Sequence, residues 1–333
     1  MSEIVILGGG ESGTGAALLA QAKGMQVFVS DLGKIKEEYK KVLSKAKIPF
    51  EENGHTKDRV LAAKEVIKSP GIPDTVPLIK QLDDQGTPVI DEIEFAARYT
   101  SGKLIGITGS NGKTTTKELI NVVLSKKYKT IATKGNLNNH IGVPLTLLSI
   151  EKDTEIAIVE MGANHKREIA HLCEIAQPDF GYITNFGKAH LEGFGGVEGV
   201  IQGKSELYDH LTAHNKYIFL NADDPIQLEK LGSHIKKFGF SADNPQYFNI
   251  QFKNADPFVA LEFEDVKVDT QLVGKYNFPN ACAAITMGKY FNVPSTDIKE
   301  ALEAYQPKNN RSQVLEQNGY QIILDAYNAN PTS

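Results

Sequence analysis

A glycine-rich segment in the middle of the chain lies between an apolar strand and a helical stretch. Residues 104–108 read LIGIT, residues 108–116 read TGSNGKTTT, and the following KELINVVLSKK is typical of a helix. A helix that begins directly after such a loop points backbone N–H groups at an anion. The segment therefore predicts a nucleoside triphosphate site on an α/β sheet, formed by Gly109, Ser110, Asn111, Gly112, Lys113, Thr114 and Thr115.

Two side chains of this segment have the chemistry that phosphoryl transfer needs. We expect the Lys113 ammonium to neutralise the β- and γ-phosphates and the Thr114 hydroxyl to bind Mg²⁺. The strict phosphate-loop pattern asks for glycine at position 107, where this chain has Ile107, so the match is to a shortened variant. A plain strand-to-helix turn is the alternative interpretation.

Short strands and helical stretches alternate through most of the chain. Apolar strands at residues 4–7, 26–30 and 65–69, with a helix from Gly13, predict a parallel sheet with crossover helices. A length of 333 residues exceeds what one core usually supports. We therefore expect a Rossmann-like domain over residues 1–102, a central ATP-binding domain over 103–307 and the incomplete beginning of a third α/β domain over 308–333.

The pattern changes in the last third of the chain. Alternating apolar and polar residues between about 245 and 274 predict antiparallel strands, and NACAAITMGKYF predicts a helix after them. The segment VLEQNGYQIILD predicts a hairpin with Asn318 and Gly319 as its turn.

The segment GGGESG at residues 8–13 follows a strand and opens a helix, with Asp31 about twenty residues further on. This spacing is that of a dinucleotide-binding fingerprint, which taken alone suggests NAD. A tight turn without a ligand, or another nucleotide site, remains open as an interpretation.

Two further strand ends suggest metal-binding chemistry. Glu160 ends the strand EIAIVE and His190 lies in the loop after FGYITN. Carboxylate oxygens suit Mg²⁺, whereas an isolated loop histidine is more often a surface residue than a ligand.

Composition narrows the classes of protein. A formal net charge of −5 with interspersed Lys and Glu does not favour a nucleic-acid partner. Cys173 and Cys282 are too far apart for a metal motif and do not predict a disulfide. The N-terminus has no secretory leader and no apolar run reaches 18 residues, so we expect a cytoplasmic protein without membrane insertion.

Several motifs taken together resemble the Mur ligases. GITGSNGKTTTKELI, GNLNNHIGVPLTLL, EMGANHKREI, TNFGKAHLEGFGG, GKSELYDHL, GKYNFPNACAA and DAYNANPTS occur in the order and spacing of that family, most closely its D-alanyl-D-alanine-adding members (MurF), over about residues 104–333. The resemblance implies ATP and two Mg²⁺ ions held by Thr114, Glu160, His190 and Lys204, the last as a carbamate. It also implies Asn138 and Asn139 in the substrate cleft, Asn277 and Asn280 at the adenine, Arg311 at the γ-phosphate and Asp325 near the ribose.

The first hundred residues resemble a different branch, the D-glutamate-adding ligases (MurD), through GGGESGTGAALLAQAKGMQVFVSD, KSPGIPDTVPLIKQL and VIDEIEFAARYTSGKL. This resemblance favours the UDP end of a cell-wall precursor over NAD. It implies UDP-substrate contacts from Gly10, Glu11, Ser12, Asp31, Ser69, Pro70 and Gly71. The combination predicts a chimera with a shortened third domain.

The resemblance implies an ATP-dependent ligase of peptidoglycan synthesis, with Lys113, Glu160, His190 and Lys204 as catalytic residues. We expect a monomer that adds D-alanyl-D-alanine to a UDP-MurNAc-peptide through an acyl phosphate, with weak turnover for the shortened chain. The alternatives are a D-glutamate-adding ligase acting on UDP-MurNAc-L-alanine, a catalytically incomplete nucleotide-binding module and, more remotely, an NAD-dependent oxidoreductase.

Overall fold

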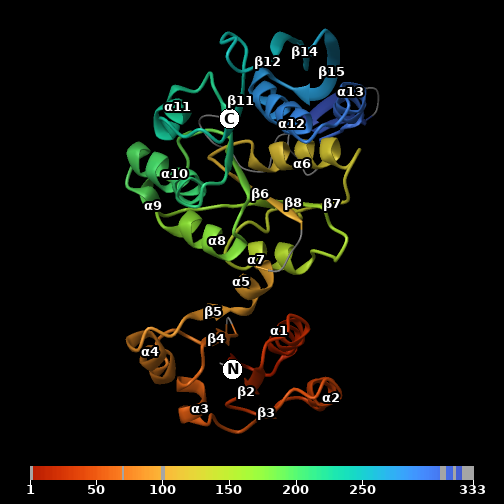
Figure 1. Ribbon diagram of the computed structural model, residues 1–333. Helices are drawn as coiled ribbons and strands as arrows, with labels where there is room; N and C mark the ends of the chain where they lie inside the picture. Colours follow the sequence, from red (N-terminus) through yellow and green to blue (C-terminus); the bar gives the residue numbers. More distant parts are fainter. Residues whose placement is uncertain (1–2, 70, 99–101, 308–312, 318–319, 325–333) are drawn as a thin grey trace. The chain divides into compact units, whose positions relative to one another are not determined.

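The computed structural model describes residues 3–69, 71–98, 102–307, 313–317 and 320–324. The chain divides into two compact units, unit 1 over residues 1–100 and unit 2 over residues 101–333 (Figure 1).

Unit 1 contains a five-stranded sheet in the order β3-β2-β1-β4-β5, and all of its strand pairs are parallel. Its elements are β1 (Ile4–Leu7), α1 (Glu11–Ala22), β2 (Val27–Ser30), α2 (Glu37–Lys45), β3 (Phe50–Glu51), α3 (Lys57–Leu61), β4 (Glu65–Lys68), α4 (Pro77–Asp84), β5 (Val89–Asp91) and α5 (Glu92–Ala97). The strands predicted from the sequence are confirmed, while α1 begins two residues before the predicted start at Gly13.

Both faces of this sheet are covered. Successive side chains of a strand point to opposite faces, so Ile4 and Ile6 pack with α1 and α2, whereas Val5 and Leu7 pack with α3 and α4. All four side chains are buried. Unit 1 is therefore a doubly wound, Rossmann-like α/β fold.

Unit 2 is built on a seven-stranded sheet in the order β12-β11-β10-β9-β6-β8-β7, again with parallel pairs. Its strands are β6 (Lys103–Thr108), β7 (Thr130–Ala132), β8 (Ile156–Glu160), β9 (Phe180–Ile183), β10 (Tyr217–Asn221), β11 (Lys237–Ser241) and β12 (Phe248–Asn249). Its helices are α6 (Lys113–Leu124), α7 (Gly142–Leu148), α8 (Glu168–Ala176), α9 (Leu191–Phe194), α10 (Val197–Ala213), α11 (Pro225–Leu231), α12 (Phe278–Tyr290) and α13 (Ser295–Ala304), with a short 3₁₀ turn at Lys275–Asn277.

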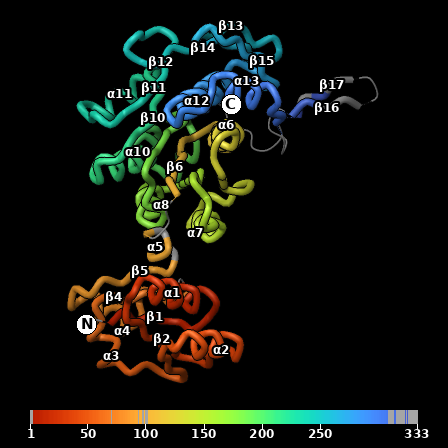
Figure 2. Tube along the Cα trace, turned by 45° about the vertical axis from the view of Figure 1, so that its right-hand side comes forward, coloured from red at the N-terminus to blue at the C-terminus, as the bar shows by residue number. Residues whose placement is uncertain are grey.

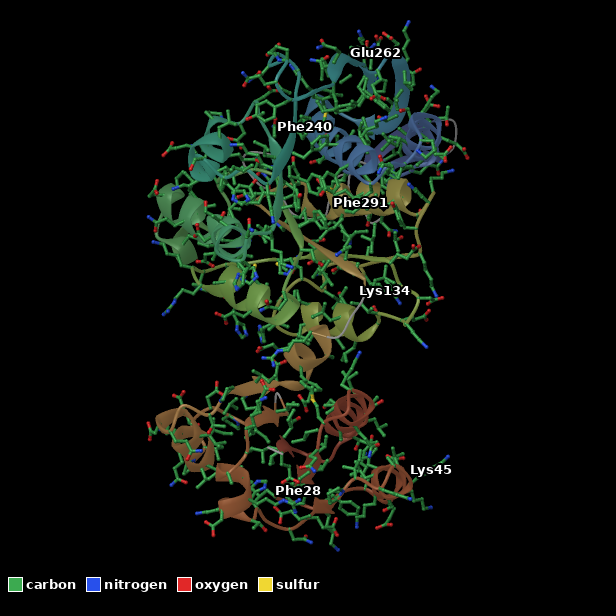
Figure 3. The ribbon with its side chains drawn as sticks, in the orientation of Figure 1. Phe28, Lys45, Lys134, Phe240, Glu262 and Phe291 are labelled. Atoms are coloured by element: carbon green, nitrogen blue, oxygen red, sulfur yellow. The ribbon has the colours of Figure 1, made fainter. Side chains whose placement is uncertain are left out.

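The main core of unit 2 lies between this sheet and helices α6, α12 and α13. Ile105 and Ile107 of β6 face this core, and Phe240 and Phe291 are packed into it as well (Figure 3). The opposite face carries α10, because a Cβ atom at Gly181 of β9 would lie 2.4 Å from the Leu211 side chain. Figure 1 shows α7 and α8 on that same side of the sheet. Unit 2 is therefore also a three-layer α/β structure.

The predicted antiparallel strands are confirmed. β13 (Gln251–Ala255), β14 (Phe258–Phe263) and β15 (Val266–Val273) form a three-stranded sheet, and β15 packs against α13 (Figure 2). The predicted hairpin strands also pair, as β16 (Gln313–Gln317) and β17 (Tyr320–Leu324). Its turn residues Asn318 and Gly319 lie outside the described residues. Within the described part of the chain, no helix combines the length and apolar character needed to cross a membrane.

Candidate functional site

The loop between β6 and α6 requires glycine at two positions. Gly109 has a φ of 136° and Gly112 a φ of 77°. Residues that carry a side chain rarely adopt these values. A Cβ atom on Gly109 would lie 2.0 Å from Thr184 Oγ1, and one on Gly112 would lie 2.6 Å from Asn280 Oδ1. The loop is thus closely surrounded by other parts of unit 2, as a preformed phosphate cradle requires.

The loop after β9 holds the phosphate loop in place. The Ser110 N–H donates to the Asn185 carbonyl over 3.1 Å, and the Asn111 N–H donates to Asn185 Oδ1 over 3.1 Å. The Thr184 hydroxyl donates to the Asn111 carbonyl over 2.5 Å. No local motif predicted a role for Thr184 or Asn185, although both follow the carboxyl end of a strand, where ligands of such sheets bind.

Lys113 begins α6 and lies over the loop. Its Nζ donates to the carbonyl of Gly109 over 2.8 Å and to that of Ser110 over 3.1 Å. These contacts place the ammonium beside the backbone that is expected to surround the phosphates. The role of Lys113 at the β- and γ-phosphates stays a prediction.

Glu160 and Thr114 come together at the carboxyl end of β8. The Thr114 hydroxyl donates to Glu160 Oε1 over 3.2 Å, and Asn138 Nδ2 donates to the same oxygen over 2.8 Å. Glu160 is buried and its second oxygen, Oε2, has no hydrogen-bond partner. A hydroxyl and a carboxylate oxygen are hard oxygen ligands of the kind that Mg²⁺ prefers, so Thr114 and Glu160 fit the ion.

Lys204 and His190 belong to a second, more cationic group. Lys204 is 1% exposed on α10, its Nζ donates to the Ala163 carbonyl over 3.1 Å and lies over the Phe194 ring. Burial, followed by the charge of Lys113, lowers the pKa of Lys204 to about 7. Burial and the charges of Lys204 and Lys113 also lower the pKa of His190. Burial and the nearby ammonium of Lys113 therefore favour the neutral amine form of Lys204.

Side chains of the described residues form no group of three or more His, Cys, Asp and Glu that could hold a metal ion. A magnesium site in unit 2 would therefore draw on Thr114, Glu160 and phosphate oxygens. His190 would contribute a second ligand set only together with a carbamate on Lys204.

Asn277 and Asn280 are buried against the start of α6. Thr116 Oγ1 donates to Asn280 Oδ1 over 3.0 Å, and Asn280 Nδ2 donates to Asn277 Oδ1 over 2.9 Å. This chain of hydrogen bonds joins the start of α12 to the start of α6. Thr115 lies in the first turn of α6, and Asn139 accepts from the N–H groups of Ile141 and Gly142 at the start of α7.

The candidate UDP residues of unit 1 gather at the carboxyl ends of β1, β2 and β4. Gly10 precedes α1, which contains the exposed Glu11 and the partly buried Ser12. The Asp31 carboxylate accepts from the N–H of Gly9 over 2.6 Å and from that of Gly33 over 2.8 Å. The Asp31 side chain thus stabilises the loop between β1 and α1 through hydrogen bonds to the backbone.

Ser69 lies beside this loop, because a Cβ atom on Gly8 would lie 3.0 Å from Ser69 Cβ. The exposed Gly71 follows two residues later. Glu92, which no motif of the sequence predicted as a site residue, accepts a hydrogen bond from Ser12 over 3.0 Å. Pro70, Arg311 and Asp325, predicted as site residues, lie outside the described residues.

A family model described as the Mur ligase middle domain matches residues 107–288, and one described as the MurD N-terminal domain matches residues 3–76. The chain is similar to the UDP-N-acetylmuramoylalanine–D-glutamate ligase of Bacteroides fragilis, with 35% identity over 340 residues, covering 100% of this chain and 74% of that protein.

A second relative belongs to the other branch. The UDP-N-acetylmuramoyl-tripeptide–D-alanyl-D-alanine ligase of Bacillus subtilis is 36% identical over 233 residues, covering 69% of this chain and 51% of that protein. Among solved structures, MurF from Acinetobacter baumannii has a TM-score of 0.66 at 27% identity, covering 99% of this chain and 66% of that one. The resemblance to both branches, predicted from the motifs, is confirmed. The chain belongs to the Mur ligase family of ATP-dependent ligases.

Proposed function

We propose that this protein joins D-glutamate to UDP-MurNAc-L-alanine at the expense of ATP. The observation that carries the choice of substrate is coverage: the D-glutamate ligase of Bacteroides fragilis aligns with all of this chain, and the MurD N-terminal model matches its first unit. The preformed phosphate loop with Lys113, Thr114 and Glu160 supports the ATP-dependent part of the proposal.

In the proposed reaction, a carboxylate oxygen of the UDP-linked substrate attacks the γ-phosphorus of ATP, and the bond to ADP breaks. The amine of the incoming amino acid then attacks the acyl carbon, phosphate leaves, and the amine loses a proton as the amide forms. Mg²⁺, held by Thr114 and Glu160, would neutralise phosphate charge. The loop N–H groups and Lys113 stabilise the charge that develops on the transferred phosphoryl group.

Lys204 is proposed to act as a carbamate. Its buried amine, held at the Ala163 carbonyl, has a neutral form that can attack CO₂ and release one proton, leaving an anion beside His190. Adding ¹³C-bicarbonate should give one carbamate resonance in the ¹³C spectrum of the wild-type protein. The signal should be absent in Lys204→Met, and a wild-type protein without it would contradict the assignment.

Addition of D-alanyl-D-alanine is the second candidate function, which the motifs of residues 104–333 favoured. The 36% identity to the Bacillus subtilis ligase over 69% of the chain supports it, as does the similarity to MurF from Acinetobacter baumannii. In either case the proposed location is the cytoplasm, and the proposed partners are ATP, a UDP-MurNAc-peptide and an amine.

Calorimetric titration separates the two candidates. The protein is titrated with UDP-MurNAc-L-alanine and with the UDP-MurNAc-tripeptide, each with Mg²⁺ and a non-hydrolysable ATP analogue. Tighter binding of the first, with ADP release that depends on D-glutamate when ATP is supplied, is the expected result. Preference for the tripeptide would favour D-alanyl-D-alanine addition, and binding of the analogue alone would leave only a nucleotide-binding module.

A further inference from the structure

A second lysine of α6, Lys117, is buried one turn after Lys113. Its side chain is 2% exposed, and its Nζ donates to the Thr133 carbonyl over 2.6 Å and to the Gly135 carbonyl over 3.2 Å. The same atom lies 3.6 Å from Glu160 Oε2. Lys117 therefore connects α6, the segment after β7 and the carboxylate at the end of β8.

A buried ammonium is costly unless it is paired and hydrogen-bonded. An apolar side chain could fill the same space, since replacing a buried ion pair by apolar groups is often neutral or stabilising. Packing alone therefore gives no reason for a lysine at this position. The surroundings of the Glu160 carboxylate give one.

The two oxygens of Glu160 have different surroundings. Oε1 accepts from Thr114 and Asn138, whereas Oε2 has no hydrogen bond and lies nearest to Lys117. The Glu160 N–H donates to Thr133 Oγ1 over 2.9 Å, on the residue whose carbonyl Lys117 binds. The Lys117 ammonium thus attracts Oε2 of Glu160 and binds the backbone carbonyl of Thr133. Oε1 of Glu160 remains hydrogen-bonded to the Thr114 hydroxyl.

We propose that Lys117 is a positioning residue, which fixes the Glu160 carboxylate so that Oε1 is presented, next to Thr114, to the divalent cation of a bound nucleotide. The proposal rests on the proposed nucleotide-binding function of unit 2 and assigns no contact between Lys117 and the nucleotide. Groups that orient metal ligands in this way commonly change metal affinity 10- to 100-fold when removed.

The test is the gain in nucleotide affinity that a metal ion provides. A non-hydrolysable ATP analogue is titrated into the full chain by calorimetry, once in EDTA and once with saturating Mn²⁺. Lys117→Met is expected to reduce the Mn²⁺-dependent gain at least tenfold and to leave the affinity in EDTA within about twofold of wild type, since the loop is retained. Lys126→Met, which removes a surface lysine paired with Glu300, serves as the matched control and should behave as wild type.

Other outcomes would overturn the proposal. An unchanged or larger Mn²⁺ gain in Lys117→Met would show that the lysine does not position Glu160, and an equal loss in EDTA would show a purely structural role. Failure of the wild-type protein to bind the analogue would remove the proposed function as well, which distinguishes the two failures. Should Lys117→Met not fold, Lys117→Gln, which keeps an N–H donor for the Thr133 carbonyl, is held to the same expectations.

Discussion

Glu92 of unit 1 is a buried acid among the candidate substrate residues. It is 3% exposed, one oxygen accepts from Ser12, and the other has no hydrogen-bond partner. Burial raises the pKa of Glu92, although hydrogen bonds from Ser12 and Ser69 oppose the rise. Glu92 therefore keeps its proton to a higher pH than an exposed glutamate does.

The raised pKa of Glu92 predicts a pH effect on stability. The folded protein holds this proton more tightly than the unfolded chain, so the contribution to stability is full below pH 4.5, the ordinary pKa, and is lost as the pH rises through the folded value. Glu92→Gln should reduce the decline in the free energy of unfolding between pH 5 and 8, measured with urea. Glu38→Gln, at an exposed position of α2, should leave the decline unchanged, and equal slopes in all three proteins would contradict the prediction.

Among single residues, the sequence predicts those that belong to a local motif. Lys113 and Thr114 follow from the glycine-rich loop, and Glu160 from its place at the end of an apolar strand. The contribution of Lys117 was not predicted, because a lysine in a helical stretch usually faces solvent. Its partners come from segments 16 to 43 positions further along the chain, and only the fold brings them together.

Among the structural elements, the loop between β6 and α6 determines the geometry of the candidate nucleotide site. Gly112 combines a φ of 77° with a close approach to Asn280, whose carbonyl oxygen accepts from Thr116. The loop can keep its shape only without a side chain at this position. A side chain at position 112 would therefore displace Asn280 of α12.

Gly112→Ala should destabilise the protein more than Gly195→Ala, because the two glycines have similar φ angles but different surroundings. Gly195 has a φ of 74° and open space around its Cα, so Gly195→Ala should cost only the backbone term of about 1 kcal/mol. Gly112→Ala should cost about 2–4 kcal/mol because Asn280 must also move, and it should weaken binding of the ATP analogue. Urea unfolding and calorimetry measure both effects, and equal costs for the two variants would contradict the steric argument.

Elements with a strong hydrophobic pattern were predicted and others were not. The buried strands β1, β6, β8 and β9 are apolar runs, and β14 and β15 alternate apolar and polar residues. Strands β3 and β12 have two residues each, too few for a period to be recognised. They form at the sheet edges because a neighbouring strand offers unpaired backbone groups.

The whole molecule consists of two units with separate hydrophobic cores. The sequence placed a domain boundary near residues 102 and 103, and the compact units divide at residues 100 and 101. The assignment of a third domain from residue 308 onward stays a prediction.

Two cores predict two unfolding transitions, which ligands should shift separately. The ATP analogue with Mg²⁺ should raise only the midpoint of unit 2, and UDP-MurNAc-L-alanine alone should raise that of unit 1. At a ligand concentration of about 100 times Kd, each shift corresponds to about 2.7 kcal/mol. Scanning calorimetry would show this, and a single transition shifted equally by both ligands would contradict it.

The hydrogen bonds that Thr184 and Asn185 make with the phosphate loop lie within unit 2. A gene segment that encodes unit 2 therefore encodes the loop together with the residues that bind it. Recombination near residue 100 would then exchange unit 1, the proposed site of the nucleotide-linked sugar, and keep these hydrogen bonds. Relatives that share one half of this chain more closely than the other are what such exchange would leave behind.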